Sequence, residues 1–222
     1  MDRQNWTGAP KPRHCLLEGR YTRLDPLSPA RHGQALLQSA LRPGAEDRFR
    51  YLFDEPPVDQ LSFAAWLETA STSHDPLFFA VIDRATGRAE GRQALMRLDP
   101  IHGVIEIGHI LWGPAIARTR VATEALALFA AYAFDTLGYR RFEWKCDSRN
   151  APSRNAAARF GFTFEGIFRH HMVVKGESRD TAWFSIISPE WPRISAALTA
   201  WLAPSNFDEA GQQRRRLEDF RT

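Results

Sequence analysis

The chain has 222 residues, of which 44% are hydrophobic and 25% charged, and its formal net charge is +3. This length and composition fit one globular domain with a sizeable core and short extensions. The mild charge, without a basic run of five or more residues, gives nucleic-acid binding little support and leaves a local anion site open. No stretch of about 18 apolar residues occurs, so we expect no membrane-spanning helix and no membrane partner.

The two cysteines, Cys15 and Cys146, lie far apart and form no Cys-x-x-Cys motif. This spacing predicts neither a disulfide framework nor a zinc site, and we expect no bound metal. The first residues lack the apolar segment of a secretory signal. A reducing, cytoplasmic location is therefore the default expectation.

The N-terminal third is predicted to contain an arm, one strand and two helices. Residues 1–15 are polar and are expected to form a loose arm, and residues 16–25 are typical of a strand. Ser28 is a candidate N-cap for a helix over 28–41. After a short irregular segment, apolar residues at helical spacing predict a second helix over 58–71.

A change of the apolar period to two residues predicts a run of β-strands in the middle of the chain. Three strands, 76–83, 89–99 and 104–113, follow one another across short turns, which is typical of an antiparallel meander. A long helix over 119–137, stopped by Gly138, comes after the third strand.

The remaining elements complete a mixed sheet. They are a strand at 140–147, a helix at 148–161, hairpin strands at 162–175 and 178–188, and a last helix at 189–203 followed by a polar tail. The strand–helix–strand unit in the middle predicts a right-handed parallel crossover. The fold class is therefore α+β, with a mixed, mostly antiparallel central sheet and helices on both faces. The last helix could pack on its own core or against a second subunit of a homodimer.

Two stretches carry a resemblance to a known family: GPAIARTRVATEAL at the start of the long helix, and SRNAPSRNAAARFGFTFEGIFR over 148–169. With the order of elements, they resemble the GNAT superfamily of N-acetyltransferases. The second stretch is similar to the pattern of the acetyltransferases that modify ribosomal-protein N-termini and of their small-molecule relatives. The pattern falls here on Asn150, Ser153, Gly161, Phe162, Glu165, Gly166 and Arg169. The resemblance implies an acetyltransferase domain over 16–190, followed by a C-terminal helix and polar tail over 191–222.

The resemblance also implies a CoA phosphate site at the start of the long helix. The family's loop, Gln/Arg-x-x-Gly-x-Gly/Ala, aligns with Ala117, Arg120 and Ala122, of which only Ala122 fits. Backbone N–H groups at a helix start bind phosphate without particular side chains, and Arg118 and Arg120 would add charge-assisted hydrogen bonds. The alternative is that both arginines are solvated loop residues. The implied acetyl-CoA contacts are Ile110, Leu111, Arg118, Thr119, Arg120, Val121, Ala122, Thr123, Asn150, Ser153 and Asn155.

Acetyl transfer to an amine needs an acid for the departing thiolate and a base for the amine. By the resemblance, Ser153 approaches the thioester sulfur and could protonate it, although Asn150 and Ser153 are also ordinary helix caps. Glu106, on the third meander strand, is the first candidate base, and its alternative is a solvated edge acid. By alternation His109 faces away from Glu106 unless Gly108 marks a bulge. The other candidate bases are His170 and His171.

The function implied is an acetyl-CoA-dependent N-acetyltransferase that modifies a primary amine of a small molecule or a protein N-terminus. The missing loop glycine leaves open a catalytically silent acyl-CoA-binding or sensing domain, and a structural protein that keeps only the fold. The first two helices and the segment between them would form the acceptor pocket. That region offers mixed chemistry, from Arg48, Arg50, Tyr51, Phe53, Asp54, Glu55 and Trp66, which does not rank the acceptors.

Overall fold

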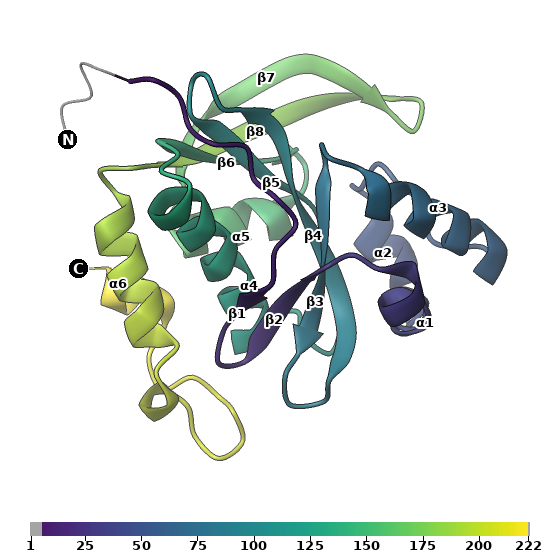
Figure 1. The fold of residues 1–222 in the computed structure, drawn as a ribbon, viewed down its shortest axis with the longest axis horizontal. Helices are drawn as coiled ribbons and strands as arrows, with labels where there is room; N and C mark the ends of the chain where they lie inside the picture. The colour runs from purple at the N-terminus through teal and green to yellow at the C-terminus, as the bar shows by residue number, and fades with distance from the viewer. Residues whose placement is uncertain (1–5, 222) are drawn as a thin grey trace.

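The computed structural model describes residues 6–221. Within them, one eight-stranded sheet has the order β1-β2-β3-β4-β5-β6-β8-β7 (Figure 1). The strands are β1 (Leu17–Glu18), β2 (Thr22–Pro26), β3 (Leu77–Asp83), β4 (Arg88–Asp99), β5 (Val104–Trp112), β6 (Arg141–Asp147), β7 (Thr163–Val174) and β8 (Glu177–Ile187). Only the β5–β6 pair is parallel among these strands. The expected crossover and the mixed, mostly antiparallel sheet are therefore confirmed.

Helices cover both faces of the sheet, as Figure 1 shows. They are α1 (Pro29–Ala40), α2 (Ala45–Phe49), α3 (Gln60–Thr72), α4 (Arg120–Ala131), α5 (Ala151–Phe160) and α6 (Trp191–Trp201). Because side chains alternate along a strand, neighbouring residues of β3 enter different cores. Phe79 enters the larger core with Phe129 of α4, whose ring centre is 5.1 Å away. Phe78 enters the smaller core beneath α1 and α3, where it meets Trp66.

The predicted N-terminal strand is split into β1 and β2 by a turn. The Glu124 carboxylate of α4 accepts hydrogen bonds from the backbone N–H groups of Arg20, Tyr21 and Thr22, at 2.6 to 2.8 Å. A Cβ at Gly19 would lie 2.4 Å from that carboxylate, so a side chain there would displace the carboxylate from its present position. The sequence prediction of a continuous strand was wrong because this partner comes from a distant helix.

Two helical predictions also differ from the structure. The segment predicted to be irregular contains the short helix α2. The long helix predicted over 119–137 is α-helical only to Ala131 and continues as a π-helical turn, η1 (Tyr132–Thr136). Asp135 of that turn accepts a 2.7 Å hydrogen bond from the Trp191 indole of α6. The wider turn therefore places a carboxylate against the last helix.

Parts of both chain ends pack against the domain, which differs from the predicted loose arm, while residues 208–216 of the predicted polar tail are exposed. In the arm, the N–H of Ala9 bonds to the carbonyl of Pro100 at 2.8 Å. In the tail, two 3₁₀ turns, η2 (Pro204–Asn206) and η3 (Leu217–Phe220), fold back on α6, and Phe207 is buried. Residues 1–5 of the predicted arm and residue 222 lie outside the described residues.

The apolar side of α6 is buried within this chain. Its Trp191, Ile194, Leu198 and Trp201 all belong to the larger core. Of the two alternatives considered for the last helix, α6 therefore packs on the core of its own chain. Within residues 6–221, no helix combines the length and the apolar character needed to cross a membrane.

Candidate active site

The two parallel strands β5 and β6 pair only over the first part of their length. Their register runs from Val104 opposite Arg141 to Ile107 opposite Trp144, and the strands then part. On the other side of β5, the register with β4 shifts between Arg92 and Ala94, and His109 has φ 49°. The bulge considered at Gly108 is therefore present, and it bends β5 where the strands separate.

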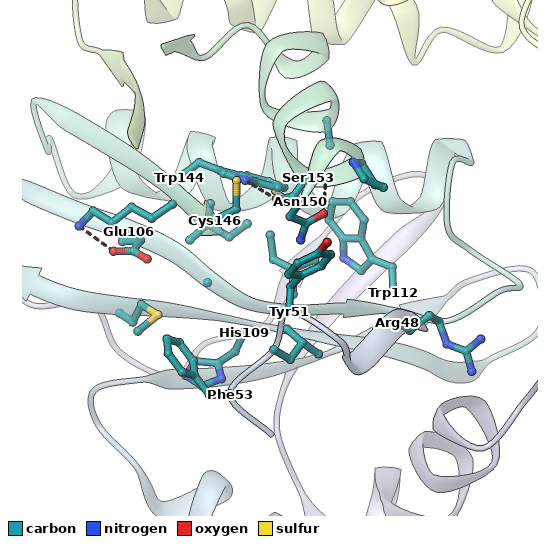
Figure 2. A pocket seen from close by; sticks show the side chains of 18 of the residues that line it. Arg48, Tyr51, Phe53, Glu106, His109, Trp112, Trp144, Cys146, Asn150 and Ser153 are labelled. Carbon is teal, nitrogen blue, oxygen red and sulfur yellow. Dashed lines mark hydrogen bonds and ion pairs between the residues drawn. The ribbon is translucent and has the colours of Figure 1, made fainter. Parts of the chain in front are cut away.

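A cavity of about 430 Å³ lies at this opening, within the usual size range of small-ligand sites. Its walls come from β4, β5, β6, Arg179 of β8, Ala117 before α4, the first turns of α5 and the segment that runs from α2 to Phe53. Figure 2 shows Phe53 with His109 on one side of the cavity and Trp144 with Ser153 on the other. The parting of two strands thus brings together segments that are distant in sequence.

Asn150 and Ser153 sit at the first turn of α5 and face this cavity. The Asn150 Oδ1 accepts a 3.1 Å hydrogen bond from the Ser153 N–H, so Asn150 caps the helix. The Ser153 Oγ accepts a 2.9 Å hydrogen bond from the indole N–H of Trp144. This bond uses a lone pair of the hydroxyl, so Ser153 keeps its proton as a donor, and the Cys146 thiol beside it is a nearby acceptor within the protein. Asn150 and Ser153 therefore take part in the helix cap and also line the cavity.

Glu106 lines the cavity and is 3% exposed, so the alternative of a solvated edge acid is wrong. Lys145 Nζ and an Arg97 guanidinium nitrogen each lie 2.9 Å from its Oε2. Lys145 also pairs with Glu143 and lies 3.8 Å from the ring centre of Trp183. The Glu106 carboxylate is thus fixed at the wall by two cations that the sequence pattern did not identify.

His109 is the histidine that the bulge places at the cavity wall. Its ring packs between Phe53 and Phe78, with ring centres 5.7 and 5.0 Å away. Burial, with a smaller effect from Arg92, lowers the pKa of His109 to about 4. Within the described residues, its buried Nδ1 has no hydrogen-bond partner. The ring is therefore neutral at physiological pH and has a lone pair or an N–H to offer.

The other two candidate histidines lie outside the cavity walls. His170 is exposed, and its backbone N–H donates to Asp180. The His171 Nδ1 lies 2.9 Å from the Thr181 hydroxyl. Among residues 6–221, no group of three or more His, Cys, Asp or Glu side chains could hold a metal ion.

The start of α4 offers backbone donors. Thr119 is its N-cap, and its hydroxyl oxygen accepts from the N–H of Val121 at 3.2 Å. Within the described residues, the N–H groups of Arg118, Arg120 and Ala122 have no hydrogen-bond acceptor. Unpaired amides at the positive end of a helix dipole form a general anion-binding arrangement.

The two arginines at this helix start differ from each other. Arg118 is exposed and has φ 64°, the left-handed conformation that glycine adopts most easily. Arg120, at the family's glycine position, is the first helical residue, so a side chain there causes no backbone strain. Its guanidinium stacks over the rings of Tyr21 and Phe207, 4.4 and 5.2 Å from their centres. Arg118 therefore fits the expectation of a solvent-facing anion contact better than Arg120.

The remaining predicted cofactor residues are divided between cavity, core and surface. Ile110 lines the cavity, whereas the side chain of Leu111 packs on the opposite side with Ala40 and Phe49. Val121 and Thr123 turn their side chains inward, and Asn155 is exposed on α5.

Arg159 of α5 is half-buried. Its guanidinium donates to the Thr123 hydroxyl at 3.2 Å and lies over the Trp201 ring. It therefore ties α5 to α4 and α6.

Only part of the predicted acceptor region reaches the cavity. Tyr51, Phe53 and Arg48 line it. The Arg48 guanidinium donates hydrogen bonds to the carbonyls of Ala40, Arg42 and Pro43. Asp54 instead pairs with the buried Arg92, which lies over Trp66 beside a separate apolar cavity. Glu55 pairs with Lys175 of the β7–β8 turn, and Arg50 lies over Tyr51. The ion pair between Glu55 and Lys175 therefore links the segment after α2 to the β7–β8 hairpin.

Sequence reasoning missed Trp144, Arg97, Lys145 and Arg179, all of which line the cavity. Alternation along 140–147 could have placed Trp144 and Cys146 on one face, toward the following helix. The cations at 97 and 179 carry no such signal, because each looks like an ordinary polar residue of a hairpin strand.

This fold, with a cavity where two parallel strands part in front of a capped helix, is that of the acyltransferase class expected from the sequence. A family model described as an acetyltransferase (GNAT) domain matches residues 23–163. The chain therefore belongs to the GNAT acetyltransferase family, and the resemblance stated above is confirmed.

Three comparisons illustrate the likeness. The crystal structure of a GCN5-related N-acetyltransferase from Brucella melitensis is 59% identical with a TM-score of 0.97, covering 98% of this chain and 99% of that one. An uncharacterized N-acetyltransferase, p20, from Bacillus licheniformis is 29% identical over 51% of this chain, and the match spans 63% of that relative's length. An acetyl transferase from Salmonella typhimurium, which modifies the N-terminal serine of a 50S ribosomal subunit protein, is 17% identical with a TM-score of 0.67 and shares the fold; 78% of this chain and 99% of that one are covered.

Proposed function

We propose that the protein transfers the acetyl group of acetyl-CoA to a primary amine of a small molecule or a protein N-terminus. The observation that carries this proposal is the cavity where β5 and β6 part, because it gathers the Ser153 hydroxyl, the Asn150 cap and the β5 bulge. The family uses acetyl-CoA as its cosubstrate. The identity of the acceptor is the part of this proposal that is supported only by the geometry of the site.

The residues present fit a CoA cosubstrate. The unpaired N–H groups of Arg118, Arg120 and Ala122 suit a pyrophosphate, and the exposed Arg118 guanidinium adds a charge-assisted donor. Ile110 and Asn150, at the parted strands and the start of α5, suit the pantetheine arm. When bound, acetyl-CoA supplies the acetyl group as an activated thioester.

The site residues supply the proton transfers. The amine nitrogen forms a bond to the acetyl carbonyl carbon and the carbon–sulfur bond breaks, so a proton leaves nitrogen and another reaches sulfur. We assign Ser153 to donate to the sulfur, because Trp144 already occupies a lone pair of its hydroxyl. Glu106 is assigned to take the amine proton, directly or through water. His109 is the second candidate base, since it is neutral and lines the same cavity.

A catalytically silent acyl-CoA-binding domain is the competing function. It is favoured by the two ion pairs that already occupy the Glu106 carboxylate. Two measurements separate the functions. At about 100 times the dissociation constant, acetyl-CoA should stabilise the fold by about 2.7 kcal/mol in a thermal-shift titration.

The second measurement is CoA release with a panel of primary amines. Binding with release supports the transferase, and binding without release from any amine supports the silent domain. No thermal shift at millimolar acetyl-CoA would remove both.

A further inference from the structure

Within the part of the chain that the structure describes, Arg179 of β8 is a buried cation without an ion-pair or hydrogen-bond partner. It is 6% exposed, its Nε is fully buried, and within the described residues its guanidinium has no hydrogen bond or ion pair. It lines the main cavity and also a neighbouring cavity of about 200 Å³, so it stands at the boundary between them. An unpaired charge is costly to bury, and proteins normally pair it or use it on a ligand.

The carboxylates around Arg179 are already engaged elsewhere. Asp147 attracts it electrostatically, but the Asp147 carboxylate is held by Arg149 through the backbone N–H and two guanidinium nitrogens, at 2.8 to 3.2 Å. Glu106 is held by its own two cations. Burial lowers the pKa of Arg179, which agrees with a guanidinium that no protein carboxylate neutralises.

The charges around the cavity leave Arg179 as the cation that an anion would meet. The walls include four cations, Arg48, Arg97, Lys145 and Arg179, and two carboxylates, Asp47 and Glu106. Glu106 and Glu143, which is not a wall residue, pair with Arg97 and Lys145, and the Arg48 guanidinium donates to backbone carbonyls. Arg179 would repel a purely cationic acceptor such as a polyamine and attract an acceptor with an anionic group.

Arg179 lies on the acceptor side of the proposed reaction centre. The Phe53 ring contacts both Arg179, whose guanidinium carbon is 5.4 Å from the ring centre, and His109, whose ring centre is 5.7 Å away. Phe53 belongs to the segment between α2 and α3, whereas the proposed phosphate site is at the start of α4. The guanidinium therefore lies on the Phe53 and His109 side of the cavity, which is the side proposed for the acceptor.

Resting on the proposed acetyl transfer, we propose that the acceptor carries a carboxylate a few atoms from its amine, as amino acids do, and that Arg179 binds this carboxylate. The planar guanidinium presents paired N–H donors that match the two oxygens of a carboxylate. The Phe53 face stabilises the guanidinium from one side and leaves its edge for the anion. Arg179 would thus decide which amines are selected, while the proton transfers belong to other residues.

The test uses matched acceptor pairs, each an amino acid as its free acid and as its amide, with amines of similar size that lack both groups. The proteins compared are the full-length wild type, Arg179→Gln, Arg179→Lys and, as a control for loss of one positive charge, Arg214→Gln. Arg214 is exposed in the C-terminal segment and absent from the cavity walls. CoA release gives kcat/KM, and calorimetry measures binding of each acceptor to the protein saturated with CoA. Acetyl-CoA thermal shifts show which variants remain folded.

The free acids should be better acceptors than their amides by about 10- to 100-fold in kcat/KM, the range of a charge-assisted hydrogen bond. Arg179→Gln should remove this preference by lowering kcat/KM for the acids and leaving the amides within about twofold. Arg179→Lys should retain part of it, and Arg214→Gln all of it.

Equal use of acids and amides by the wild type, or a preference that survives Arg179→Gln, would overturn the inference and leave acetyl transfer intact. If no amine releases CoA but the acids still bind in an Arg179-dependent manner, acetyl transfer fails and the carboxylate site stands. If the acids neither react nor bind, both are overturned. Should Arg179→Gln fail to fold, the same decisions rest on Arg179→Lys and the acid–amide ratio of the wild type.

Discussion

Acid should destabilise this protein through His109. Burial lowers the pKa of its imidazole from 6.5 to about 4, with Arg92 and Arg97 acting in the same direction and Asp54 opposing them. Between these two pKa values His109 is protonated in the unfolded chain and neutral in the folded chain. The free energy of unfolding therefore decreases as the pH falls from about 6.5 to about 4. This difference in pKa corresponds to about 3.4 kcal/mol of stability in full, and to about 2 kcal/mol at pH 5.

Urea unfolding at pH 7 and pH 5 measures this effect, with wild type compared with His109→Gln. The wild type should lose about 2 kcal/mol more than the variant, because the contributions of other titrating groups are common to both and cancel. His170→Gln, at an exposed histidine, is the matched control and should follow the wild type. Equal losses in wild type and His109→Gln would refute the buried, neutral imidazole.

Three further predictions concern the proposed reaction. Arg118→Ala should weaken CoA binding about tenfold and leave pantetheine binding unchanged, because the exposed guanidinium is assigned to phosphate; equal weakening of both ligands in calorimetry would contradict that role. Ser153→Ala should lower turnover by about 10² or more without moving the pH–rate profile, since a serine hydroxyl does not titrate in the working range. Glu106→Gln should lower turnover at unchanged CoA affinity, because the carboxylate is assigned to the amine and not to the cosubstrate. Normal turnover of this variant would transfer the role of base to His109.

Much of the fold could be predicted from local signals. Ser28 caps α1 and Gly161, at φ 94°, ends α5, and the period-two pattern located the hairpins. Long-range contacts decided the rest. The turn between β1 and β2 depends on Glu124, and the packed tail depends on the ring of Phe207 against Tyr21, 6.1 Å between centres. In both cases the partner lies far outside the span that a local pattern covers.

Part of the candidate site could also be predicted from local signals, and part of it depends on long-range contacts. Ser153 and Asn150 could be predicted because one contiguous motif places both at a helix start. The surroundings of Glu106 could not, since its two cations come from β4 and β6. The position of His109 depends on a bulge that alternation alone does not locate. Arg179 was missed because nothing in its neighbourhood in sequence distinguishes a buried guanidinium from a solvated one.

The contact between Arg120 and Phe207 has a consequence for cosubstrate binding. The shared domain model ends at residue 163, whereas Phe207 lies in the C-terminal addition beyond it. Yet its ring stacks, with that of Tyr21, on the first residue of α4, beside the proposed phosphate site. The C-terminal segment therefore supports the start of α4, where the phosphate site is proposed. Deleting or exchanging residues 204–221 should then alter cosubstrate affinity as well as folding.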